Sequence, residues 1–159
     1  MKLSTRARYA VRAMVDLAIH SDEHPVPRKD IARRQEISPH YLEQLFIKLR
    51  DAGYIEAIRG PGGGYHLSQS PEHIRVGTLI ATVEEILGPV PCLRAESPME
   101  CHRAPTCVTR RLWRQLGQTV YHFLDSITLQ DLCDEALELA ASGPSTCLSK
   151  TLYTQEDTP

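Results

Sequence analysis

Apolar residues recur at helical spacing over the first part of the chain and predict a series of short helices. The first helix is expected to begin after Ser4, whose hydroxyl suits an N-cap, and to end near Ser21. A turn over residues 22–26 follows. Pro27 stands where the first turn of a helix tolerates proline, and it opens a second helix over residues 28–35.

A third helix is predicted to start at Ser38, a natural N-cap, with Pro39 at the first helical position. Gly53 ends it, because glycine commonly stops a helix. A short helix, a tight turn and a second amphipathic helix form the helix-turn-helix pattern. Tyr41, Leu42, Leu45, Phe46 and Leu49 recur at helical spacing, and Leu42, Leu45, Phe46 and Leu49 form the stripe expected to be buried.

A β-hairpin is predicted directly after the third helix. Residues 54–58 have the composition of one strand, residues 65–67 that of the returning strand, and residues 59–64 form the turn Arg-Gly-Pro-Gly-Gly-Gly. The turn is not a P-loop, because it lacks a Lys-Ser/Thr pair and precedes a strand instead of a helix. A hairpin in this position makes the unit a winged helix-turn-helix.

The second half of the chain has a different organisation. A helix over residues 76–87 leads into a proline-rich loop over residues 88–107 that shows no apolar period. A long helix over residues 108–127 presents a continuous apolar stripe, and a shorter helix covers residues 129–140. The end of the chain is rich in Ser, Thr and Pro, and we expect residues 141–159 to be a flexible tail.

The fold class expected from these elements is mainly α, with a small β-hairpin wing and a long C-terminal dimerisation helix. Residues 1–75 would form the DNA-binding winged helix-turn-helix domain, and residues 76–140 the loop and the dimerisation helices. Charge divides along the same boundary, since residues 1–75 hold 12 Lys/Arg against 9 Asp/Glu (+3) and residues 76–159 hold 6 against 11 (−5). A polyanion would therefore meet the N-terminal part.

No apolar run is long enough to cross a bilayer, and the first residues lack the features of a signal peptide. We therefore expect a cytoplasmic protein with no membrane partner.

The third helix offers polar side chains to the major groove, whose width of about 12 Å admits an α-helix. Gln44 can bond adenine bidentately, and Glu43 can accept a hydrogen bond from the amino group of cytosine. Arg28, Lys48 and Arg50 are better suited to phosphates. The polar residues near the start of the helix that could reach base edges are Ser38, His40, Tyr41, Glu43 and Gln44.

The hairpin turn is a second candidate contact. Arg59 could extend into a narrow minor groove, while a tip without side chains at Gly60, Gly62 and Gly63 lets the backbone approach the sugar-phosphate wall. The alternative for the whole unit is a helix-turn-helix domain that binds protein instead of DNA.

Three of the five cysteines, Cys92, Cys101 and Cys107, lie in the proline-rich loop. Thiolates are soft ligands for zinc or an iron-sulfur cluster, and a metal would order a loop that has no core of its own. Spacing alone leaves both groups open, as well as three unligated thiols, although the lack of a closely spaced cysteine pair argues against zinc. A thiol-redox or electron-transfer protein is disfavoured because no Cys-x-x-Cys or βαβ pattern is present, so we expect no enzyme.

Several segments resemble the IscR-type iron-sulfur winged-helix regulators of the Rrf-type family: YAVRAMVDLA, SPHYLEQLFIKLRDAGYIEAIRGPGGGYHL, the cysteine loop and TRRLWRQL. The resemblance implies a homodimer that binds a palindromic operator in double-stranded DNA. It implies minor-groove insertion by Arg59 and an iron-sulfur cluster, of the 2Fe-2S type, on the three loop cysteines and a following histidine. It implies base reading by His40, Tyr41, Glu43 and Gln44.

Two positions depart from the family pattern. His40 stands where the most similar regulators have serine, so that base contact differs. Arg110 takes the place of the histidine ligand, and a guanidinium is a very poor metal ligand. His102 is the nearest candidate for the fourth ligand, with Glu96, Glu100, solvent or a group from a second subunit as alternatives. Three thiolates also suit a 4Fe-4S cluster, and Arg110 could instead offset the cluster's charge and raise its reduction potential.

The apolar stripe over residues 108–127 is long for a monomer whose other elements are short. Two such helices could pair, which would set two recognition helices about 34 Å apart, one turn of DNA; the alternative is packing within one subunit. The resulting hypothesis is a redox or iron-status switch in which cluster loading orders residues 88–107 and changes how Glu43 faces the operator. A zinc-stabilised or cluster-free regulator that senses nothing is the remaining alternative.

Overall fold

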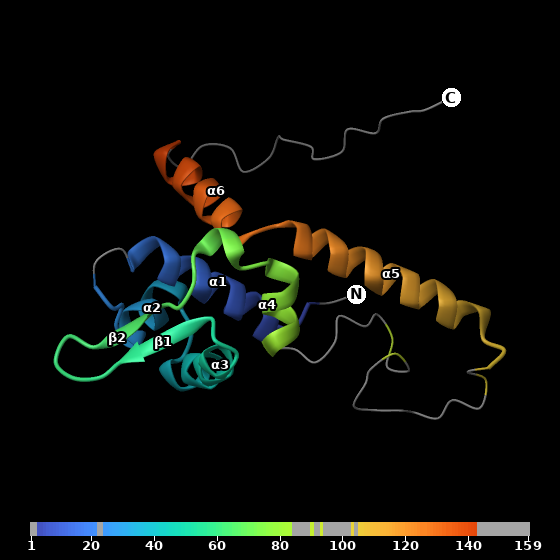
Figure 1. Ribbon diagram of the computed structural model, residues 1–159, viewed down its shortest axis with the longest axis horizontal. Helices are drawn as coiled ribbons and strands as arrows, with labels where there is room; N and C mark the ends of the chain where they lie inside the picture. The colour runs from blue at the N-terminus through green and yellow to red at the C-terminus, as the bar shows by residue number, and fades with distance from the viewer. Residues whose placement is uncertain are drawn as a thin grey trace.

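The protein is described by a computed structural model over residues 3–21, 24–83, 90, 93, 103 and 105–142. Three helices, α1 (Thr5–His20), α2 (Arg28–Gln35) and α3 (Pro39–Asp51), precede the strands β1 (Ile55–Ile58) and β2 (Gly64–Leu67). The 3-10 turn η1 (Pro71–His73) and the helices α4 (Val76–Val83), α5 (Val108–Ser126) and α6 (Leu129–Ala141) follow (Figure 1). The predicted class, mainly α with one small hairpin, is confirmed. None of the described helices has the length and apolar character of a membrane span.

Capping residues explain why the first helices begin where they do. The Ser4 hydroxyl accepts a hydrogen bond from the amide of Ala7 at 3.1 Å, and the Ser38 hydroxyl accepts one from the amide of Tyr41 at 3.2 Å. Each bond satisfies an amide that has no partner within its own helix. Pro27 precedes α2 as its N-cap residue and makes no side-chain cap bond, so it lies just outside the helix that it was predicted to open.

The core lies where α1, α3, α4 and α6 meet behind the hairpin. Met14 and Leu17 of α1 are fully buried, as is Phe46 of α3. Tyr65 of β2 packs edge-on against Phe46, with the ring centroids 4.8 Å apart. The hairpin is therefore fixed to the third helix by an aromatic contact as well as by the short chain that joins them.

The hairpin is antiparallel, with Ile55 opposite Leu67 at its base and Ile58 opposite Gly64 near its tip. A third segment joins its edge, because the Val26 amide donates to the Tyr65 carbonyl at 2.8 Å and the Tyr65 amide donates to the Val26 carbonyl at 2.9 Å. This contact ties the wing to the turn before α2.

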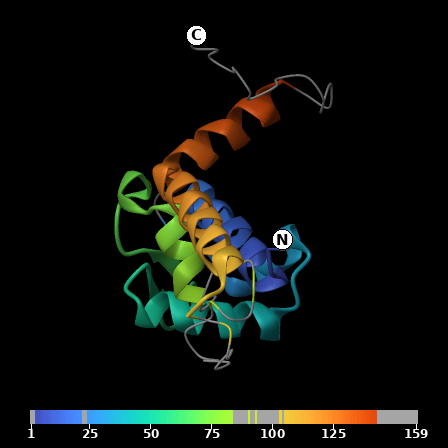
Figure 2. The same cartoon turned by 90° about the vertical axis from the view of Figure 1, so that its right-hand side faces the viewer.

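The α5 helix is attached to the body of the molecule through its C-terminal half. The amide and hydroxyl of Thr78 in α4 both donate to the Asp125 carboxylate, at 2.9 and 2.7 Å. The N-terminal half of α5 projects beyond the packed helices (Figures 1 and 2). α5 ends one residue earlier than predicted, because Ile127 is extended and its carbonyl accepts a hydrogen bond from the amide of Val76.

Three predictions fall partly or wholly outside the described residues. They are the last turn of the helix expected to reach residue 87, most of the loop over residues 88–107, and the tail beyond residue 142.

Candidate nucleic-acid interface and metal site

The third helix has two distinct faces. Leu42, Leu45, Phe46 and Leu49 are at most 2% exposed and attach the helix to the core, as their spacing predicted. On the other face His40 and Gln44 are exposed, while Glu43 and Lys48 are half-buried. The polar residues predicted to read bases are therefore on the solvent side of a helix that the core holds in place.

The start of α3 is held by contacts with α1. The Tyr41 ring lies edge-on to Tyr9, with centroids 5.9 Å apart, and the Arg12 guanidinium lies 5.7 Å from the Tyr9 centroid. Tyr41 is half-buried by these neighbours, and the Ser38 hydroxyl is engaged in the N-cap bond. These two residues thus have a structural role at the helix start in addition to the contact predicted for them.

Arg28 and Glu43 form an ion pair between α2 and α3. Arg28 Nη1 lies 2.6 Å from Glu43 Oε1, and the two side chains are 35% and 43% exposed. The sequence assigned Arg28 to phosphate and Glu43 to a base, and it gave no sign that they meet. Their contact depends on how the two helices cross, which local sequence patterns do not report.

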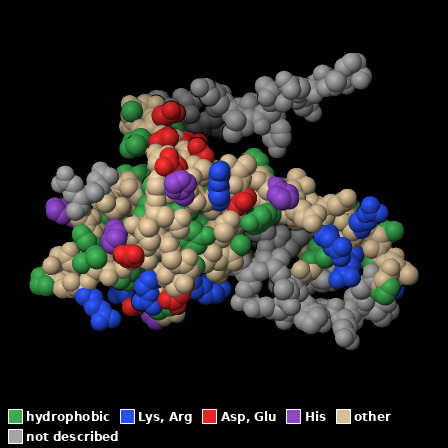
Figure 3. Space-filling model, viewed as in Figure 1, with side chains coloured by type: hydrophobic (Ala, Val, Ile, Leu, Met, Phe, Trp, Pro, Cys, Tyr) green, Lys and Arg blue, Asp and Glu red, His purple; other side chains and the backbone are tan. Residues whose placement is uncertain are grey.

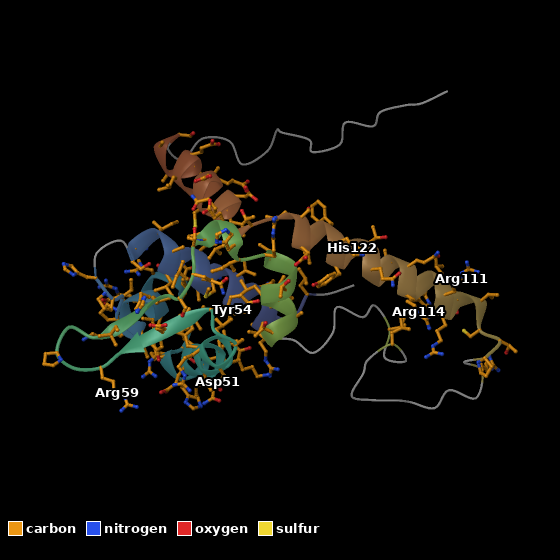
Figure 4. All side chains as sticks on the ribbon, in the orientation of Figure 1. Asp51, Tyr54, Arg59, Arg111, Arg114 and His122 are labelled. Carbon is orange, nitrogen blue, oxygen red and sulfur yellow. The ribbon has the colours of Figure 1, made fainter. Side chains whose placement is uncertain are left out.

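The wing presents Arg59 at the turn of the hairpin. Its side chain is exposed and projects on the side of the molecule where α3 lies (Figure 4). Gly60 has φ 109°, a conformation that L side chains rarely adopt. A Cβ on Gly63 would collide with the carbonyl oxygen of Ile58. The glycines are thus required by the turn itself, and between Gly60 and Gly63 the one side chain is that of Pro61, which is exposed.

Charge is distributed unevenly over the surface. Lys and Arg side chains lie along the edge formed by α3 and the hairpin and also gather on the N-terminal half of α5, whereas Asp and Glu side chains cluster on α6 (Figure 3). The exposed acidic residues of α6 are Asp131, Asp134, Glu135 and Glu138. The edge that carries the predicted DNA contacts would attract a polyanion.

Of the three loop cysteines, Cys107 lies within the described residues; Cys92, Cys101 and the candidate ligand His102 do not. Cys107 is the N-cap residue of α5, with its Sγ 3.2 Å from the Thr109 hydroxyl. That hydrogen bond, with a second from the Arg110 amide, lowers the pKa of the Cys107 thiol. A thiolate is the form that binds metal, so the environment of Cys107 suits a ligand.

Arg110 lies one helical turn beyond Cys107, where the family pattern places a histidine. It is half-buried, and its Nε is a buried donor that has no hydrogen-bond partner among the described residues. A guanidinium has no free electron pair for a metal, so Arg110 does not fit the role of a ligand. Of the described residues, Cys107 therefore fits a thiolate ligand, whereas Arg110 cannot take the place of the histidine ligand.

Cys133 is different in kind. It is a buried core residue of α6, and burial raises the pKa of its thiol. Such a thiol is inert compared with one at a helix start.

Comparison with known proteins agrees with this geometry. The family model Rrf2, described as an iron-dependent transcriptional regulator, matches residues 3–135. The HTH-type transcriptional regulator IscR of Vibrio campbellii is 46% identical over 142 residues, which cover 88% of this chain and 83% of that protein. IscR of Aliivibrio salmonicida is 48% identical over 132 residues, covering 83% and 77%.

Solved structures show the same fold. T. potens IscR superposes with a TM-score of 0.70 at 39% identity, covering 87% of this chain and 90% of that one. CymR, the global cysteine regulator of B. subtilis, superposes with a TM-score of 0.68 at 38% identity, covering 85% and 98%. The chain therefore belongs to the Rrf2 family of iron-dependent transcriptional regulators, and within it is a winged helix-turn-helix, DNA-binding regulator of the IscR type.

Proposed function

We propose that the protein is a homodimer that binds a palindromic operator and whose affinity for that operator is controlled by an iron-sulfur cluster. The observation that carries the proposal is the position of Cys107 directly before α5. A thiol suited to metal binding thus directly precedes a helix whose apolar face is exposed. A chemical change at the thiol therefore acts on the element that we assign to dimerisation.

The proposed DNA contacts follow from the exposed face of α3 and from the wing. Gln44 and His40 would reach base edges, and Lys48 would contact phosphate. Arg59 would enter the minor groove, with the backbone at Gly60, Gly62 and Gly63 against the sugar-phosphate wall. The proposed contact set is completed by Arg28, Ser38, Tyr41 and Glu43.

The proposed dimer interface is the apolar face of α5. Val108 is 83% exposed and Phe123 is 63% exposed, although both are large apolar residues in an amphipathic helix. Leu112 and Leu116, at 54% and 40%, continue the same face. A monomer rarely exposes so long an apolar patch, and a second copy of the helix would cover it.

The proposed cluster ligands are the thiolates of Cys92, Cys101 and Cys107, with His102 as the candidate for the fourth position and Glu96 or Glu100 as alternatives. A bound cluster supplies a link between loop and helix that responds to oxidation and to iron supply. Cys107 would place one ligand at the start of α5, and the positive charge of Arg110 one turn away would offset the negative charge of the bound thiolates.

The test is to purify the protein under nitrogen, quantify iron and sulfide, and record the visible spectrum. Cys107→Ala should lose iron and visible absorption, whereas Cys147→Ala, outside the proposed ligand set, should keep both. A colourless protein that contains zinc would support the zinc-stabilised regulator instead. Equal affinity of the wild type and Cys107→Ala for every duplex would exclude control by the cluster.

A further inference from the structure

The Arg28–Glu43 pair differs from the other exposed ion pairs of the helix-turn-helix. Asp30 pairs with Arg33 within α2 at 3.8 Å, and Asp51 pairs with its neighbour Arg50 at 2.9 Å. The Arg28–Glu43 contact, at 2.6 Å, joins two helices instead. It also fixes the one carboxylate that lies in the middle of the exposed face of α3.

We propose that Arg28 determines operator specificity by holding and neutralising the carboxylate of Glu43. The inference rests on the proposed function, because it requires that α3 enters the major groove. Under it, Arg28 is a positioning residue whose effect on DNA binding acts through Glu43.

The electrostatic reason is the approach of a carboxylate to a polyanion. An unpaired Glu43 would repel nearby phosphates, and only a cytosine amino group at the right place would offer it a favourable contact. A guanidinium at 2.6 Å cancels most of that charge. The pair contributes little in water, but it strengthens when DNA displaces solvent from both half-exposed side chains.

The geometry also restricts where Glu43 can point. A carboxylate bound to a residue of α2 is turned toward that helix and away from the bases that a free side chain would sample. Arg28 keeps further N–H donors after pairing, so it can contact a phosphate while it holds Glu43. Specificity at the Glu43 position should then depend on Arg28, although Arg28 itself touches no base.

The experiment is a double-mutant cycle on the full-length dimer. A duplex selected by the wild type from a library with randomised half-sites, and its single base-pair variants, are bound to wild type, Arg28→Gln, Glu43→Gln and the double variant. We expect Arg28→Gln to weaken binding to the selected duplex by about tenfold when Glu43 is present, and by no more than about threefold when it is Gln. The ranking of the variants at the base pair that faces Glu43 should change in Arg28→Gln. In the double variant, which has no carboxylate there, the protein should discriminate little among the bases at that position.

Arg33→Gln is the matched control, because it removes one positive charge from the same helix at a side chain that is 78% exposed. Its base-pair ranking should equal that of the wild type. An equal loss on Arg28→Gln in both Glu43 backgrounds, uniform over all duplexes and with the salt slope reduced by about one, would show a simple phosphate contact and overturn the inference. Failure of the wild type to bind any duplex, with or without its metal, would instead overturn the proposed function.

Discussion

Asp16 is the one charged side chain of α1 that the described structure buries, at 2% exposure. Arg34 Nε in α2 donates to both of its carboxylate oxygens, at 2.7 and 2.9 Å, and His20 Nδ1 lies 3.3 Å from one of them. A buried carboxylate is costly unless it is paired and hydrogen-bonded. The pair therefore holds α2 against α1, the two helices on which α3 packs.

Removal of Arg34 should expose this dependence. Arg34→Ala leaves the Asp16 carboxylate buried without its cation, and the free energy of unfolding should fall by about 2–3 kcal/mol. Arg33→Ala, at a side chain that is 78% exposed, should change it by no more than about 0.5 kcal/mol. Urea denaturation followed by circular dichroism measures both. A similar fall in the free energy of unfolding in the two variants would mean that the buried pair contributes no more to stability than an exposed arginine does.

Gly64 illustrates a packing constraint that the sequence showed only as part of a glycine run. A Cβ at this position would collide with the carbonyl group of Val26, whose contacts tie the wing to the turn before α2. Gly64→Ala should therefore cost about 1–3 kcal/mol of stability and displace the hairpin. Gly62→Asn is the control, since Gly62 has φ 77° with open space around it and asparagine tolerates that conformation. Thermal unfolding should separate the two variants by several degrees.

At the scale of elements, helix bounds were predictable because short-range chemistry sets them. Ser4 and Ser38 are N-caps in the structure as the sequence indicated. The 3-10 turn at Pro71–His73 was missed because a single turn of three residues leaves no periodic pattern. The bridge from Val26 to the hairpin was missed because it depends on the approach of two distant segments.

The candidate site also has features that local sequence predicts and features that depend on how distant segments meet. The buried stripe of α3 predicted which side chains face solvent. The ligand role of Cys107 stays a prediction, because Cys92, Cys101 and His102 lie outside the described residues. The Arg28–Glu43 pair was not predictable, because it depends on the crossing of two helices. A residue type and its spacing thus identified candidates for the site, but not which of them would be bound to each other.

The capping box of α6 gives an element-level prediction with a pH dependence. The Thr128 amide donates to Asp131 Oδ2 at 2.8 Å, and this bond, followed by the Thr128 side chain, lowers the pKa of Asp131. The Asp131 amide in turn donates to the Thr128 hydroxyl at 3.0 Å. Because the folded-state pKa lies below that of the unfolded chain, the contribution is present above the unfolded value of about 3.9 and is lost as pH falls through the folded value.

Asp131→Ala should therefore lower the thermal midpoint at neutral pH, and the gap to the wild type should close as the pH falls below about 4. Asp134→Ala, on the exposed face of the same helix, is the control and should shift the midpoint much less at every pH. A gap for Asp131→Ala that stayed constant down to acidic pH would show that the carboxylate charge is not what stabilises the helix start.

At the scale of the whole molecule, the two halves of α5 have different surroundings. Its C-terminal half is bonded to α4 through Asp125, and its N-terminal half extends past the body with Arg111 and Arg114 pointing outward (Figure 4). The recognition helix and the wing lie on the opposite part of the molecule. In the proposed dimer, an event at the start of α5 would therefore influence DNA binding mainly by changing how the two copies are placed relative to each other.

The apolar face of α5 is where this arrangement can be tested most directly. Leu112 is 54% exposed in the single chain, so Leu112→Glu should leave the helical signal and the unfolding midpoint of the subunit nearly unchanged. In a paired helix the same carboxylate would be buried against apolar side chains, and the dimer should dissociate at micromolar concentration in sedimentation equilibrium. Binding to a palindromic duplex should then weaken by about 100-fold or more, because each half-site must be held independently.

Leu139→Glu, at a residue of α6 that is 66% exposed, adds the same charge outside the proposed interface and should remain dimeric. Dissociation of Leu139→Glu together with an intact Leu112→Glu dimer would place the interface on α6, and the coupling between Cys107 and the dimer would lose its structural basis.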